Sequence, residues 1–245
     1  MGAQQFRSMK THERGINMPI KYTRQQMLDK IVQASSDMGQ FYQQAFVNYV
    51  GKTSDTKEEY TEIVAEWLIQ NPQYLHQIAP IRRRSSYRIQ THNGITPADD
   101  SNRLEERTAM AMFRQRGLPF LGLVIDYQTP LKDEISSKAG KIDLLTYDGS
   151  VLRILEMKNP LSKETMLRCV LEGFTYLKTA DTGKLLQDFV LPVDTEVRTS
   201  PFVCKGGFQQ LEMRSKRPYL RQLMEMLNCS PYYYEKVKTL YIVEQ

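Results

Sequence analysis

Residues 140 to 160 read GKIDLLTYDGSVLRILEMKNP, and this stretch decides the fold of the chain. Two apolar runs, residues 141–147 and 151–158, flank the dipeptide Asp148-Gly149. Alternating or apolar runs of this length are typical of strands, and Asp-Gly is among the strongest hairpin signals in short sequences. The stretch therefore predicts two antiparallel strands joined by a tight turn.

The parity of this hairpin brings polar side chains together. With Asp148 and Gly149 as a two-residue loop, Tyr147 pairs with Ser150 and Asp143 lies opposite Ile154. Side chains alternate along a strand, so Asp143, Glu156 and Lys158 project from the same face. In this register the two acids are diagonal neighbours, about 7 to 8 Å apart at the backbone.

Two interpretations of these side chains follow from chemistry alone. Carboxylates and a lysine on an apolar strand pair are costly to desolvate, and a divalent cation would join them. Oxygen ligands without His or Cys favour Mg²⁺ or Mn²⁺ over Zn²⁺, and such an ion suits phosphodiester hydrolysis. The alternative is that Lys141, opposite Glu156, and Lys158 form ordinary salt bridges with Asp143 and Glu156.

The spacing also carries a resemblance. Asp143, twelve intervening residues and then Glu156-Met157-Lys158 resemble the signature of the PD-(D/E)XK nuclease superfamily, although Ile142 replaces the Pro of the family name. The resemblance implies an α/β fold with a restriction-endonuclease-like core: helix, three strands, helix, strand, with a mixed central sheet flanked by helices.

The same resemblance implies the chemistry. Asp143, Glu156 and the carbonyl of Met157 would hold Mg²⁺ (or Mn²⁺), and Lys158 would assist the attacking water. The substrate would be nucleic acid, DNA before RNA, and a homodimer is allowed because many relatives cut duplexes as dimers. The alternative function is a nuclease-fold protein that binds nucleic acid or protein without cutting.

Two predicted helices flank these strands. Residues 102–116 form the first, and Glu106-Arg107 followed by Gly117 resembles the junction resolvases, so Glu106 is the predicted further catalytic and metal-binding acid, with Glu105 as alternate. Residues 162–178 form the second, on which Glu172 and Tyr176 resemble a Gln and Tyr pair of some members. Further strands are expected at 121–127, 202–205 and 238–243, and a further helix at 218–228.

The rest of the chain divides by pattern. Residues 1–22 predict a loose leader, residues 23–98 a helical extension, and residues 99–245 the nuclease-like domain. In the extension, Thr23 and Gln26 form a capping box for a helix that runs toward Gly51. A second helix is expected to begin at Thr56 and to end before Asn71-Pro72.

Charge and composition bound the partners. The 245 residues carry 33 Lys and Arg against 28 Asp and Glu, a net charge of +5 that permits a polyanionic partner. The densest basic cluster is the predicted nucleic-acid contact, with Tyr87 placed to stack on a base. Its members, together with Lys141, are Arg82, Arg83, Arg84 and Arg88.

Other site classes are disfavoured. Three cysteines without a C-x-x-C pair argue against a zinc ribbon or a disulfide framework, and Cys169 lies on the apolar side of a helix. Three scattered histidines indicate no metal triad, and no glycine-rich phosphate loop is present. No apolar run approaches the length of a membrane span, so a cytoplasmic protein without membrane association is expected.

Overall fold

The chain is described here from a computed structural model, which covers residues 21–94, 104–132 and 140–245. The predicted leader therefore falls almost entirely outside the described residues. Within them, seven strands form one sheet in sequential order. The strands are β1 (Gly117–Leu118), β2 (Gly122–Pro130), β3 (Lys141–Tyr147), β4 (Val151–Lys158), β5 (Glu196–Cys204), β6 (Tyr232–Val237) and β7 (Leu240–Glu244).

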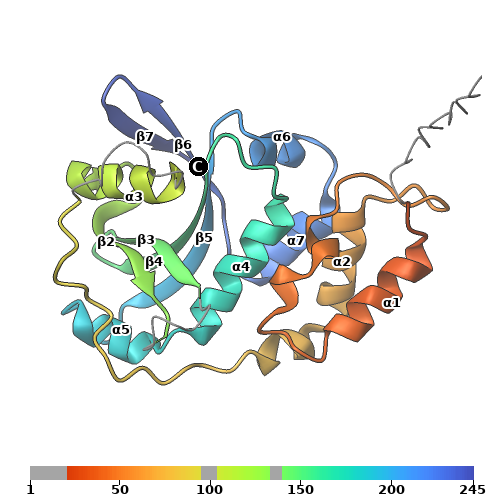
Figure 1. Ribbon diagram of the computed structural model, residues 1–245, viewed down its shortest axis with the longest axis horizontal. Coiled ribbons are helices and arrows are strands. Elements are labelled where there is room, and N and C mark those ends of the chain that lie inside the picture. The colour runs from red at the N-terminus through yellow and green to blue at the C-terminus, as the bar shows by residue number, and fades with distance from the viewer. Residues whose placement is uncertain (1–20, 95–103, 133–139) are drawn as a thin grey trace, which may run out of the picture.

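Helices cover both faces of the sheet (Figure 1). One apolar core lies between the sheet and α3, and a larger core joins the other sheet face to α4 and the N-terminal helices. The helices are α1 (Arg24–Ala34), α2 (Tyr60–Gln70), α3 (Leu104–Gln115), α4 (Met166–Thr179), α5 (Thr182–Asp188), α6 (Phe208–Arg214) and α7 (Pro218–Met226), with 3-10 turns η1 (Phe41–Gln43), η2 (Ala45–Asn48) and η3 (Pro72–Gln77).

The sheet is mixed. Strands β2, β3 and β4 are antiparallel neighbours, β5 and β6 run parallel to β4, and β7 returns antiparallel to β6. The parallel step from β4 to β5 is made through α4, as a crossover connection requires. This arrangement confirms the predicted α/β class.

The two strands of the predicted hairpin have the expected bounds, but the C-terminal part was underestimated. β5 begins at Glu196 rather than residue 202, and α5, α6 and β6 were not predicted. The first half of β5 reads EVRTSP, which lacks an apolar run. Thr199 is nevertheless buried, and its hydroxyl donates to the carbonyl of Ile154 on β4, so tertiary pairing makes this polar segment a central strand.

In the extension, the capping box of Thr23 and Gln26 is confirmed. The first helix ends at Ala34 instead of continuing toward Gly51, because the turn-forming residues SSDMG follow and the chain then makes 3-10 turns. The second helix begins at Tyr60 with Glu59 as its N-cap, so its predicted start at Thr56 was wrong, while its end before Asn71 is confirmed.

The extension packs directly on the sheet domain. Its apolar residues share one core with the inner face of α4. The side chain of Asn48 accepts a 2.6 Å hydrogen bond from the backbone of Thr165, the N-cap of α4, whose hydroxyl donates to Val47. The extension therefore supports the loop between β4 and α4. Among the described residues, no helix has the length and apolarity to cross a membrane.

Candidate metal and phosphodiester site

The hairpin turn is longer than predicted. Tyr147 pairs with Leu152, and Leu145, rather than Asp143, lies opposite Ile154. The cause is the side chain of Asp148, which accepts hydrogen bonds from the backbone N–H groups of Ser150 and Val151 and closes a wider turn. The register is shifted by two residues, and a shift of two preserves the side-chain faces. Leu145, Leu152 and Ile154 share one core and Leu144, Leu155 and Met157 the other, as predicted, whereas Ile142, predicted on the second face, packs in the first core.

Asp143 lies where β3 and β4 separate. One carboxylate oxygen accepts a 2.9 Å hydrogen bond from the backbone N–H of Met157, and the other accepts one of 2.9 Å from the side chain of Gln128 on β2. Burial raises the pKa of this carboxyl to about 7, against the opposing effects of Lys158 and the Met157 N–H group. The contacts that the protein offers to the ionised carboxylate therefore do not fully offset its loss of hydration.

Glu156 points toward α4 and is 3% exposed. Its Oε1 accepts from the ammonium of Lys158 at 2.7 Å, whereas its buried Oε2 has no hydrogen-bond partner among the described residues. Burial raises the pKa of Glu156 well above its usual value, and nearby Glu172 and Asp143 add to the shift. A buried carboxylate oxygen without a donor is unfavourable unless a ligand supplies a positive charge.

Lys158 is surrounded by carboxylates. Its Nζ lies 2.7 Å from Glu156, 2.8 Å from Glu164 and 3.2 Å from Glu172. Burial alone would lower the pKa of Lys158, but these acids outweigh it and raise the pKa well above its usual value. The ammonium is therefore charged, and it donates hydrogen bonds to Glu156 and Glu172, while its contact with Glu164 is an ion pair.

The helix after the hairpin holds this arrangement in place. Tyr176 donates a 3.0 Å hydrogen bond to Glu172, which also lies 3.5 Å from the guanidinium of Arg168. Burial would raise the pKa of Glu172, but Lys158 and Arg168 hold it below its usual value. The predicted Glu172 and Tyr176 pair thus faces the site through Lys158.

Glu105, the alternate acid of α3, contacts the end of β4. Glu105 accepts hydrogen bonds from the backbone and side chain of Asn159, the residue after Lys158, and its charge acts on Asp143. Adjacent helical residues project about 100° apart, so the two acids cannot share this direction.

The predicted arginine cluster is divided between interior and surface. Arg83 is 7% exposed and donates to the carbonyls of Lys132 and Ser86, so its predicted role in nucleic-acid contact is replaced by a structural one. Tyr87 is fully buried, and its hydroxyl accepts from the backbone of Asp181, which prevents base stacking. The exposed members are Arg82, Arg84, Arg88 and Lys141.

Two site residues were not predicted from the sequence. Gln128 reaches Asp143 from β2, and Glu164 reaches Lys158 from the loop before α4. Neither residue lies at a sequence spacing from Asp143 or Lys158 that marks it as part of the site, because each comes from a different element. A positive φ of 48° at Gln128 marks an irregular point in β2 at the position facing Asp143.

The donor set fits a hard divalent cation. Among residues with described positions, no group of three or more His, Cys, Asp or Glu side chains has an arrangement that would hold a metal. Mg²⁺, however, commonly takes one or two carboxylates and completes its shell with water and substrate oxygens. Asp143, Glu156 with its unpartnered Oε2, and the carbonyl of Met157 meet that smaller requirement.

Comparisons of the chain with protein-family models, curated proteins and solved structures found no match.

Proposed function

We propose that this chain is a metal-dependent nuclease with a PD-(D/E)XK-like core that hydrolyses phosphodiester bonds in DNA. The observation that carries the proposal is that Asp143 accepts from the backbone of Met157, next to Glu156, while a buried oxygen of Glu156 has no hydrogen-bond partner in the part of the chain that the structure describes. The element order α3, β2, β3, β4, α4, β5, with β5 parallel to β4, supports the same core.

The residues have distinct roles in this proposal. Asp143, Glu156 and the Met157 carbonyl would hold Mg²⁺ or Mn²⁺, with Glu105 beside them. When bound, the ion would polarise the scissile phosphate and lower the pKa of a coordinated water. Lys158 would orient the attacking water and offset the negative charge that develops on the phosphate oxygens.

To reach the attacking water, Lys158 would exchange its contact with Glu164, an ion pair without hydrogen-bond geometry, and would keep the hydrogen bonds that it donates to Glu156 and Glu172. The side chain of Glu164 is 33% exposed, compared with 4% for Glu156 and 11% for Glu172. Water can replace Glu164 at the smallest desolvation cost, so Glu164 is the partner that leaves.

The test is cleavage of labelled duplex DNA, single-stranded DNA and RNA in Mg²⁺, in Mn²⁺ and in excess chelator. Asp143→Asn and Glu156→Gln should each reduce metal-dependent cleavage by about 10² or more while the variants stay folded by circular dichroism. Asp194→Asn, which changes an exposed acid, is the matched control and should cleave normally. Cleavage that persists in chelator, or in both site variants, contradicts the proposal.

A binding module that does not cut is the second candidate. The observation in its favour is that Lys158 already pairs with three acids, so the site carries internal salt bridges without an ion. Metal-independent DNA binding with no cleavage by the wild-type chain would select this candidate.

A further inference from the structure

A second polar cluster lies on β2, two residues before Gln128. Nδ1 of His92 lies 2.6 Å from one oxygen of Asp126, and Thr129 donates a 2.8 Å hydrogen bond to the other. Asp126 is 2% exposed and Thr129 is fully buried. A carboxylate held in this way fixes the imidazole with Nδ1 as the donor.

The ring of His92 is also held in orientation. It stacks on Tyr127 with centroids 4.3 Å apart and an interplanar angle of 21°. The hydroxyl of Tyr127 accepts from the backbone of Gly94, which fixes the segment that carries the histidine. Because Nδ1 is committed to Asp126, Nε2 is the ring nitrogen left for a ligand, and the side chain is 17% exposed.

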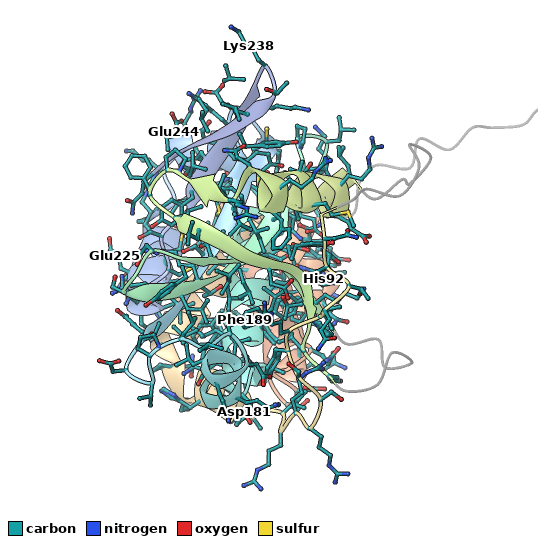
Figure 2. All side chains as sticks on the ribbon, turned by 90° about the vertical axis from the view of Figure 1, so that its left-hand side faces the viewer. His92, Asp181, Phe189, Glu225, Lys238 and Glu244 are labelled. Atoms are coloured by element: carbon teal, nitrogen blue, oxygen red, sulfur yellow. The ribbon has the colours of Figure 1, made fainter. Side chains whose placement is uncertain are left out.

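The cluster is close to the candidate metal site. Asp126 and Gln128 are about 7 Å apart along β2, and Gln128 binds Asp143 directly. Figure 2 shows His92 beside the ribbon of β2. Residues 81–94 contain four arginines and no acidic residue, and three of these arginines are exposed.

We infer that His92, oriented by Asp126, is a phosphate-binding residue for the nucleic-acid strand next to the bond that is cut. When Nε2 carries a proton it donates to a phosphate oxygen, and the ring then lies between two anions that both stabilise it. The inference rests on the proposed nuclease function, because that function supplies the strand beside the ring.

A structural role makes a different prediction. If His92 only holds residues 88–94 against β2, its contribution to stability comes from the contact between Nδ1 and Asp126. In His92→Asn the amide nitrogen can replace Nδ1 as donor to Asp126, but nothing replaces Nε2. The variant therefore keeps the fastening and removes the proposed phosphate contact.

The test measures binding of a fluorescently labelled DNA duplex in chelator, where metal-dependent cleavage cannot occur. His92→Asn should weaken binding about tenfold with an unchanged unfolding temperature. His76→Asn, at an exposed position on η3, is the control and should bind like wild type. Equal affinity of His92→Asn and wild type, or no binding by wild type, overturns the inference.

A second measurement tests the contact in the wild-type chain, in case His92→Asn loses stability. The chain has three histidines, so ¹⁵N-histidine NMR can follow Nε2 of His92 as the duplex is added. A shift of this resonance supports the contact, and an unmoved resonance overturns it. Cleavage in Mg²⁺ is scored separately: binding through His92 without cleavage contradicts hydrolysis alone, whereas cleavage that is unaffected in His92→Asn contradicts the phosphate contact alone.

Discussion

At the scale of single residues, Lys158 organises the site. It is 7% exposed and pairs with acids from its own strand, the following loop and α4. Removing one partner of a buried ion pair strongly destabilises the protein, because the other charge stays buried without compensation. The lysine therefore makes the close arrangement of Glu156, Glu164 and Glu172 possible.

The two acids of α3 give the first prediction. Glu105→Gln should lower metal-dependent cleavage about tenfold, since Glu105 meets Asn159 and acts on Asp143. Glu106→Gln is the matched control, with the same change one residue along the helix, and should retain most activity. Rates measured at saturating Mg²⁺ decide between them, and the reverse order would restore Glu106 as the site acid.

The second prediction concerns pH and the metal-free protein. A carboxyl whose folded pKa is raised stabilises the fold fully below its unfolded pKa, about 3.9, and loses that contribution as pH rises through its folded pKa. For Asp143 the folded pKa is about 7, so the free energy of unfolding should fall between about pH 4 and 7.

Asp143→Asn removes this titration. In urea unfolding with chelator present, the fall between pH 5 and pH 8 should be smaller in the variant than in wild type by about 1–3 kcal/mol. A fall of equal size in both proteins would show that Asp143 ionises as freely in the folded chain as in the unfolded one.

At the scale of elements, the close approach of α4 to the sheet positions the acids. Gly173 allows this approach: a Cβ there would lie 2.5 Å from the hydroxyl of Thr199 and 3.5 Å from the Cβ of Glu156. Because Gly173 has no side chain to press on β4 and β5, α4 lies close enough to the sheet for Glu172, the residue before it, to reach Lys158.

Gly173→Ala should therefore destabilise the protein by about 1–3 kcal/mol and reduce cleavage, because α4 or Thr199 must move. Gly183→Ala in α5 is the control, since a Cβ there meets nothing closer than 3.8 Å and alanine favours helix. Thermal unfolding of the two variants gives the comparison, and equal unfolding temperatures would contradict the role of Gly173.

At the scale of the whole molecule, the N-terminal extension and the sheet domain are joined through the start of α4. Asn48 and Val47 bind Thr165, while Glu212 on α6 accepts from the backbone of Met166. Both contacts fix the loop that contains Glu164. The extension therefore acts on the site without contributing a ligand to it.

Asn48→Ala tests this coupling. Loss of the acceptor leaves the Thr165 N–H without its partner, which should cost about 1–2 kcal/mol of stability and lower cleavage several-fold. Asn71→Ala is the control from the same extension, because its side chain binds the carbonyl of Trp67 away from the loop. A stable Asn48→Ala variant with full activity would contradict the coupling.

Much of the fold near the site could be predicted from local pattern. The bounds of β3 and β4 are those of the apolar runs, and the face shared by Asp143 and Glu156 survived an error of two residues in register. The polar first half of β5 could not be predicted, since its hydrogen-bond partners lie on β4 rather than along its own sequence.

The sequence by itself determined the α/β class, the hairpin and the nearness of Asp143, Glu156 and Lys158, because alternation along a strand and turn chemistry are local properties. Tertiary structure decided which α3 acid approaches, that Gln128 and Glu164 join, and that Arg83 and Tyr87 are interior. These outcomes depend on how separate elements pack, and burial and distance between elements are not encoded in the spacing of any one segment.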